Sequence, residues 1–258
     1  MTLLDDIEKL RLEYARFHVA IEQALRETYY KGIDDQRFET EEVKKDIEDH
    51  VFRRYEGTLT QYIPWITKVF NLSDKTIVEI GCGTGSSTAA FAHFAKHIYA
   101  YEVSESSALA AKARIQIMGI NNVSIIQSEP DALLETLKSN HHAGVSVVLL
   151  FAVLEHMTVQ ERLRTLKEAW DLLLPGGILI VAETPNRLTY FDHHTSWLPF
   201  FHFLPLDLAV EYYDRSPREM VKLGLKHYRN QLGANTAEDA LTRMGTAVSF
   251  HEFEIALG

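Results

Sequence analysis

Thr76-Ile-Val-Glu-Ile-Gly-Cys-Gly-Thr-Gly85 is the stretch that decides the fold, because it joins a buried strand directly to a glycine-rich turn. The apolar residues between positions 77 and 80 are β-branched and nearly continuous, as expected of a parallel strand that is covered on both faces. The glycines permit positive φ angles and allow a ligand to approach the backbone closely. A helix over residues 86–95 would then point its first amide groups at that ligand.

Alternating strands and helices follow this stretch along the chain. Apolar runs predict strands at residues 98–103, 122–127, 145–151 and 178–182. Helical patterns separate them at residues 106–118, 131–138 and 159–174, and Pro175-Gly176-Gly177 closes the last of these. Repeated β-α units of this length predict an α/β fold, a doubly wound Rossmann-like and mostly parallel sheet with helices on both faces.

The chain before this stretch predicts a helical N-terminal cap over residues 1–72, followed by a main domain over residues 73–258. A helix over residues 3–30 carries an apolar seam of alternating three- and four-residue steps at Leu3, Ile7, Leu10, Tyr14, Phe17, Ile21 and Ala24. The seam favours packing against the rest of the chain, and the alternative is a coiled coil that makes a homodimer. One further helical pattern precedes Gly57 and another follows it, and we expect Gly57 to separate the two helices. Pro64 should lie near the start of the second helix or kink it.

Composition limits the class of protein. The formal charge of −10 over 258 residues repels nucleic acid and anionic membranes, so we expect a small-molecule substrate rather than a polynucleotide. The single cysteine, Cys82, suits a reducing compartment and a packing role. The first ten residues have neither the basic segment nor the apolar segment of a signal peptide. No apolar run reaches the ~20 residues that span a bilayer. We therefore expect a cytoplasmic protein without a membrane segment.

Residues 184–215 break the β-α rhythm with aromatic residues and prolines. An insertion after a strand's carboxyl end is well placed to cover a ligand, so a lid over about residues 184–235 is predicted. Its Tyr190 and Trp197 are candidates to stack on an acceptor, although a simple hydrophobic cover is an equal alternative. Beyond it, we expect helices over residues 216–228 and 236–244 and a strand over residues 247–256.

The glycine spacing argues against a dinucleotide, because the third glycine follows the second by two residues and position 86 is serine. A nicotinamide oxidoreductase is thus the weaker alternative. Glu79-Ile-Gly-Cys-Gly-Thr-Gly85 instead resembles motif I of the class I S-adenosylmethionine-dependent methyltransferases. The resemblance covers about residues 76–183, and the flanks are similar to ubiquinone-biosynthesis-type O-methyltransferases.

This resemblance implies S-adenosylmethionine as cofactor and assigns roles by position. Glu79 would lie near the methionine ammonium group, and the glycines would allow close backbone approach. Glu102 ends the second strand, where a carboxylate can accept both ribose hydroxyls. After the third strand, Ser128 with Glu129 is favoured over Asp131 for the adenine. The implied cofactor residues are Glu79, Gly81, Cys82, Gly83, Thr84, Gly85, Glu102, Val103, Ser128, Glu129, Phe151 and Ala152.

Methyl transfer needs a base only if the acceptor carries a proton, and histidines are the natural candidates. We consider His156, which follows the fourth strand, and the neighbours His193 and His194, of which only one is expected to face a site. Small-RNA 2′-O-methyltransferases hold a divalent ion with a related E-x-x-E-H arrangement. Ala152 occupies the first glutamate position here, so we predict no metal, although Glu155 and Asp192 add potential ligands.

The sequence therefore predicts transfer of a methyl group from S-adenosylmethionine to a small molecule, with oxygen favoured over nitrogen as acceptor atom. A catalytically silent protein that binds the cofactor is the alternative from another class. The resemblance implies two strands after the fifth, and residues 247–256 can supply only the sixth. A truncated domain of a longer protein is one explanation.

Overall fold

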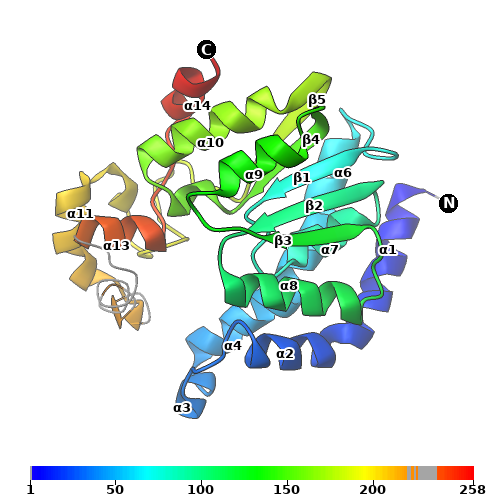
Figure 1. Cartoon of the computed structure of the whole chain (residues 1–258). Coiled ribbons are helices and arrows are strands. Elements are labelled where there is room, and N and C mark those ends of the chain that lie inside the picture. Colours follow the sequence, from blue (N-terminus) through cyan, green and yellow to red (C-terminus); the bar gives the residue numbers. More distant parts are fainter. Residues whose placement is uncertain (1, 220–221, 224, 226–236) are drawn as a thin grey trace. The chain divides into compact units, whose positions relative to one another are not determined.

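The computed structural model describes residues 2–219, 222, 223, 225 and 237–258. These residues form two compact units. Unit 1 comprises Met1–Phe151 and Leu172–Ile180, and unit 2 comprises Ala152–Asp171 and Val181–Gly258. The helical N-terminal region and the first four strands thus belong to the same unit (Figure 1). The division of the chain near residue 72 stays a prediction.

The predicted sheet is confirmed. Its five strands are β1 (Thr76–Ile80), β2 (His97–Glu102), β3 (Val123–Gln127), β4 (Val145–Phe151) and β5 (Leu173–Ala182). They lie in the order β3-β2-β1-β4-β5, and β1 pairs in parallel with both β2 and β4, as β2 does with β3. The fully buried side chains of Ile77, Val78, Val147 and Leu150 explain why these strands read as continuous apolar runs.

Helices cover both faces of this sheet (Figure 1). The connections through α7 (Ser86–Ala92) and α8 (Glu105–Ile117) lead outward from β1 to β2 and β3. The connection through α9 (Leu133–Asn140) returns across the sheet to β4. Right-handed crossovers therefore place α7 and α8 on one face and α9 on the other. This reversal next to β1 puts the glycine turn at the point where α/β sheets bind ligands.

The N-terminal seam packs inside unit 1. The predicted helix is present as α1 (Leu3–Tyr14), a 3₁₀ turn and α2 (His18–Glu27), and Thr2 caps it with Asp5 in a capping box. The central seam residues Ile7, Tyr14 and Ile21 are buried, and α2 contacts α8. The buried part of the seam thus packs against the chain's own core, the first of our two alternatives, and the homodimer stays a prediction.

Residues 41–67 form one helical run, which corrects the predicted interruption at Gly57. After the short α3 (Asp35–Phe38), the run contains α4 (Glu41–Glu48), a π-helical segment (Asp49–Arg53), α5 (Arg54–Gly57), a second π-helical segment (Thr58–Tyr62) and α6 (Ile63–Thr67). Gly57 adopts helical dihedral angles, so its flexibility does not break the helix when its neighbours are packed. Pro64 lies in the first turn of α6, one of the two predicted positions.

Unit 2 is mostly helical. A 3₁₀ turn (Leu154–His156) is followed by α10 (Val159–Asp171), and α11 (Leu206–Tyr212) lies between two further 3₁₀ turns at Phe201–Phe203 and Tyr213–Arg215. The predicted C-terminal helix is confirmed as α13 (Ala237–Met244). Phe201, Ala209, Tyr213 and Leu241 form an apolar cluster between α11 and α13. Part of the helix expected over residues 216–228, and part of the lid, lie outside the described residues.

Two further sequence predictions were wrong, and the first of them lies near the C-terminus. Residues 250–257 form the helix α14 (Phe250–Leu257), and the described part of the sheet has no sixth strand. Ser249 and Glu252 make a capping box that starts this helix, and the carboxylate of Glu252 also pairs with Arg162 of α10 at 3.3 Å in a buried position. The capping box and this ion pair favour a helix more strongly than the alternation of the sequence favours a strand.

The other error concerns Pro175-Gly176-Gly177, which we expected to close a helix. Helix α10 already ends at Asp171, and these three residues lie within β5. Gly176 has φ +82°, a left-handed conformation inside the strand that glycine adopts without a steric penalty. Among the described residues, no helix has the length and apolar character needed to span a membrane.

Candidate functional site

The glycine turn after β1 has the expected left-handed backbone, with φ +77° at Gly81, +53° at Gly83 and +77° at Gly85. A side chain is disfavoured at Gly83 and at Gly85 for different reasons. A Cβ atom at Gly83 would meet no atom within 4 Å, so its face is open to a ligand. A Cβ atom at Gly85 would lie 3.0 Å from Cβ of Ala111 in α8. Helix packing therefore also requires a glycine at position 85, and its role in cofactor approach stays a prediction.

Glu102 ties the glycine turn to the carboxyl ends of two strands. Its Oε2 accepts the amide of Gly83 at 2.7 Å, and its Oε1 accepts the amides of Val103 and Ser104 at 2.9 and 2.8 Å. Its backbone carbonyl accepts the amide of Ser128 at 3.0 Å. The carboxylate is buried and held by three donors, which fixes its orientation at the ends of these strands.

Glu79 lies beneath the turn with no exposed surface. Its two oxygens accept the hydroxyls of Ser87 at 3.0 Å and Thr88 at 2.6 Å. Burial raises the pKa of Glu79 to about 7, against the opposing effect of these two hydrogen bonds. Burial also raises the pKa of the Cys82 thiol, which disfavours its nucleophilic thiolate form and fits the packing role expected of this residue.

The turn is also held from its other side by the N-terminal helices, a contact that the sequence analysis missed. The Thr84 hydroxyl lies 3.0 Å from Nδ1 of His50, which sits in the first π-helical segment. The guanidinium of Arg114, from α8, donates to the carbonyl oxygens of Thr84 at 2.9 Å and His50 at 2.8 Å, and to the Tyr14 hydroxyl at 2.6 Å. All four side chains are buried.

The remaining cofactor candidates line the ends of β2, β3 and β4. Ser128 is buried, whereas Val103 and Glu129 are exposed. Phe151 is buried at the end of β4, with its ring edge-on to Tyr62 at 5.1 Å. Ala152 follows with φ +54°, an unusual angle for a residue with a Cβ atom, and such local strain concentrates at functional sites.

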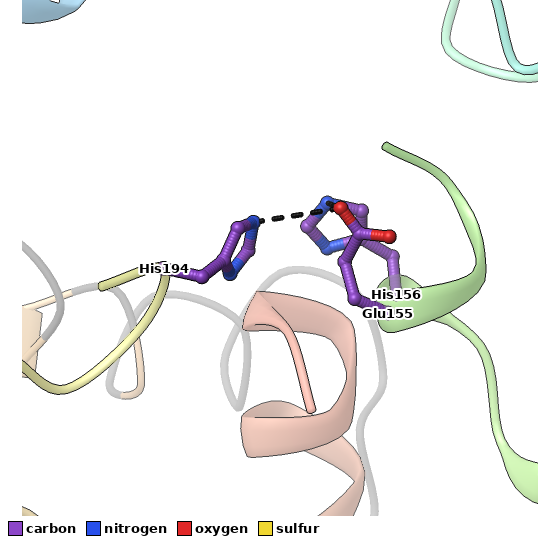
Figure 2. Close-up of side chains that lie close together, drawn as sticks. All are labelled: Glu155, His156 and His194. Atoms are coloured by element: carbon purple, nitrogen blue, oxygen red, sulfur yellow. Dashed lines mark ion pairs between the residues drawn. The ribbon is translucent and has the colours of Figure 1, made fainter. Parts of the chain in front are cut away.

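Unit 2 brings three of the polar candidates together (Figure 2). Glu155 and His156 come from the 3₁₀ turn after β4, and His194 comes from the aromatic insertion. Oε1 of Glu155 lies 3.9 Å from Nε2 of His156 and 3.6 Å from Nε2 of His194. One ligand-type atom from each residue falls within 4.8 Å of the other two. The convergence of the two sequence segments was not foreseen.

His193, the other predicted base, is not in this cluster. Its ring lies 4.6 Å from that of Phe191, and its carbonyl accepts the Nε1–H of Trp197 at 3.0 Å. Of the two neighbouring histidines, only His194 faces the cluster, which agrees with the expectation that one of them would do so. Buried Asp192 sets this loop by accepting the amides of His194, Thr195 and Ser196 at 2.7–3.0 Å.

The two predicted acceptor-stacking residues are exposed on this insertion. Tyr190 packs edge-on against Phe200 at 4.8 Å, and the guanidinium of Arg218 lies 5.0 Å from the centre of the Trp197 ring. Their role in binding an acceptor stays a prediction.

Comparison with known proteins agrees with the motif. Residues 78–179 match the family described as a methyltransferase domain, as predicted. The chain is 27% identical over 158 residues to a "probable S-adenosylmethionine-dependent methyltransferase" of Mycobacterium tuberculosis, covering 61% of this chain and 50% of that protein. It is 27% identical over 107 residues to a tRNA/tmRNA (uracil-C(5))-methyltransferase of Nitratiruptor, covering 38% and 30% of the two chains.

Among solved structures, the chain is similar to an S-adenosylmethionine-dependent methyltransferase from Clostridium acetobutylicum. The TM-score is 0.46 at 14% identity, with 59% of this chain and 61% of that chain covered. The chain spans about half the length of the Mycobacterium relative and less of the Nitratiruptor one. The more specific similarity to ubiquinone-biosynthesis-type O-methyltransferases stays a prediction.

Proposed function

We propose that this chain is an S-adenosylmethionine-dependent methyltransferase that modifies a small molecule at oxygen. The family match over residues 78–179 and the named Mycobacterium relative support the methyltransferase class and the cofactor. The acceptor and its atom rest on the chemistry of the residues alone. One of the similar proteins acts on tRNA, so the acidic charge of this chain does not by itself exclude a nucleic-acid acceptor.

The observation that carries the cofactor assignment is the pairing of Glu102 with Gly83. The space at Gly83 is open on the side where a Cβ atom would stand, and the Gly83 amide holds a carboxylate oxygen of Glu102 at 2.7 Å. A ligand that approaches the turn therefore meets an ordered carboxylate able to accept hydroxyl protons, as a ribose requires. These residues fit an adenosine-containing ligand without phosphates better than a dinucleotide.

Bound S-adenosylmethionine supplies a methyl group on a positively charged sulfur, which an acceptor displaces in line. The task of the protein is then to bind the two reactants, to orient them and to exclude water from them. The ionised form of Glu79, next to the turn, suits the ammonium end of the cofactor. An oxygen acceptor must also lose its proton, and the imidazoles of His156 and His194 are groups of unit 2 that can take part in this step.

A direct test uses the purified chain in two measurements. Calorimetric titration with S-adenosylhomocysteine should give saturable binding with one site, and NAD should give none. Transfer of an isotopically labelled methyl group should then occur to phenols or sugar hydroxyls.

The outcomes separate the alternatives. Turnover with amines alone would refute the oxygen assignment, and turnover with tRNA alone would refute the small-molecule acceptor. Cofactor binding without transfer to any component of a cell extract would favour the catalytically silent alternative. Binding of NAD without S-adenosylhomocysteine would overturn the whole proposal.

A further inference from the structure

We propose that Glu155, His156 and His194 form a binding site for one divalent transition-metal ion. The inference starts from the way their three side chains converge (Figure 2). Both Nε2 atoms approach the same carboxylate oxygen, Oε1 of Glu155, at 3.9 and 3.6 Å. The partners of the other ring nitrogen, Nδ1, explain why Nε2 is the atom that each histidine turns toward Glu155.

Nδ1 of each ring has a hydrogen-bond partner of its own. Nδ1 of His156 lies 3.0 Å from the carbonyl oxygen of Arg243, which can only accept, so this nitrogen carries the hydrogen. Nδ1 of His194 lies 2.8 Å from the Thr195 hydroxyl. That hydroxyl donates its own hydrogen to the Gly245 carbonyl at 2.8 Å, so it accepts from His194.

With Nδ1 of each ring held by these partners, Nε2 is the ring atom turned toward Oε1 of Glu155. Two imidazole nitrogens and one carboxylate oxygen thus converge from two segments of the chain, and one metal ion can bind all three at once. Histidine ligands fixed through the other nitrogen by a carbonyl or hydroxyl are typical of metal centres.

The surroundings hold the three ligands in place. The Thr184 hydroxyl donates to Oε2 of Glu155 at 3.2 Å, which leaves Oε1 turned toward the histidines. The backbone amide of Thr246 donates to the Glu155 carbonyl at 2.8 Å. Gly245, with φ +130°, makes room for the His194 ring, since a Cβ atom there would lie 2.5 Å from the ring. The residues just after α13 thus contact both segments of the cluster.

The donor set indicates which ion fits. Two imidazoles and one carboxylate suit Zn²⁺, Fe²⁺, Co²⁺ or Mn²⁺ better than Mg²⁺ or Ca²⁺, which prefer oxygen ligands. Metal–ligand bonds of about 2.0–2.2 Å place tetrahedral ligand atoms roughly 3.4 Å apart. The observed 3.6 and 3.9 Å need only small side-chain rotations to reach this value.

Three protein ligands leave at least one coordination position for an exchangeable oxygen ligand. If the proposed methyl transfer to oxygen is correct, such an ion can lower the pKa of an acceptor hydroxyl, and His156 and His194 then serve as ligands rather than as bases. This role rests on the proposed function, whereas the binding of the ion does not. The proposed site departs from our prediction of no metal, which relied on Ala152 in place of a glutamate.

The test measures metal binding directly. The full chain, without a histidine tag, is treated with a chelator and titrated with Co²⁺, whose visible absorption reports nitrogen ligation. We expect one equivalent to bind and Zn²⁺ to displace it, while Mg²⁺ does not. His156→Ala and His194→Ala should each weaken Co²⁺ binding at least 100-fold. Thr195→Val, which removes only the partner of Nδ1, should weaken it about 10-fold.

His193→Ala is the matched control, because this neighbouring histidine lies in the same loop and faces away from the cluster. It should leave Co²⁺ affinity unchanged. Absence of saturable Co²⁺ binding, or equal loss in His193→Ala and His194→Ala, would refute the site. Titration with S-adenosylhomocysteine separates the two proposals: Co²⁺ binding without cofactor binding would retain the metal site and refute the methyltransferase, and the reverse result would do the opposite.

Discussion

At the scale of single residues, Glu79 gives the stability a defined dependence on pH. Burial raises its pKa from 4.5 to about 7, so the folded protein keeps a proton that the unfolded chain releases. The sign follows from linkage: this contribution is fully present below pH 4.5 and is lost as pH rises toward 7. The shift corresponds to about 3 kcal/mol between pH 4 and pH 8.

Glu79→Gln should remove this dependence while keeping a side chain that can bond to Ser87 and Thr88. In urea unfolding, the free energy of unfolding of the variant relative to the wild type should rise by about 3 kcal/mol from pH 4 to pH 8. Glu129→Gln, at an exposed position, is the control and should show a flat difference. A flat difference for Glu79→Gln as well would mean that Glu79 is not buried as described.

Glu102 is the residue on which cofactor affinity should depend most. Glu102→Gln removes the charge and turns an amide group toward the amides of Gly83, Val103 and Ser104. Hydrogen bonds to charged groups are worth about 1.5–3 kcal/mol, so S-adenosylhomocysteine should bind roughly 10- to 100-fold more weakly in calorimetry. Glu105→Gln, three residues further on and exposed, should bind it normally. Equal affinities of both variants would remove Glu102 from the site.

At the scale of elements, α14 shows where local sequence patterns mislead. Residues 247–256 alternate well enough to predict a strand, and ten residues are too few to separate a period of 2 from one of 3.6. The decisive signals were the Ser249–Glu252 capping box and the buried pairing of Glu252 with Arg162. The capping box could have been read from the sequence, whereas the pairing joins residues of α10 and α14 that are far apart in the chain.

Ser249→Ala tests this element. Losing an N-cap should lower the free energy of unfolding by about 1 kcal/mol and shift the melting temperature down by roughly 2–4 °C. Ser139→Ala replaces an exposed serine inside α9 and should not destabilise the protein, since alanine is the better helix former. A neutral effect of Ser249→Ala would contradict the helical start at this position.

At the scale of the whole molecule, the two candidate sites differ in how well the sequence predicted them. The turn, Glu79 and Glu102 lie within 30 residues of one another and have fixed places in a repeating β-α pattern, so their neighbourhood follows from local order. The cluster of unit 2 needs Glu155, His194 and Gly245, which come from three separate segments. No pattern in the sequence states that such distant segments meet, and Ala152 argued against a metal.

The contact of Arg114 with the N-terminal helices gives a prediction for unit 1 as a whole. None of its hydrogen-bond partners among the described residues is acidic, so the charge is stabilised by the His50 and Thr84 carbonyls and the Tyr14 hydroxyl. Arg114→Lys keeps the charge but cannot reach all three, and should cost about 2–4 kcal/mol in urea unfolding. Arg37→Lys, at an exposed position, should change stability by less than about 0.5 kcal/mol. Equal effects would refute this role of Arg114.

The same guanidinium limits how this chain can be recombined with its relatives. Tyr14, His50, Thr84 and Arg114 come from four different elements, yet they satisfy one buried charge together. A chimera whose crossover point falls between residues 14 and 114 takes Tyr14 and Arg114 from different parents, so it can keep the buried cation while losing the Tyr14 hydroxyl. Crossover points before Tyr14 or after Arg114 leave the set whole, so libraries built at those positions should contain the larger fraction of folded proteins.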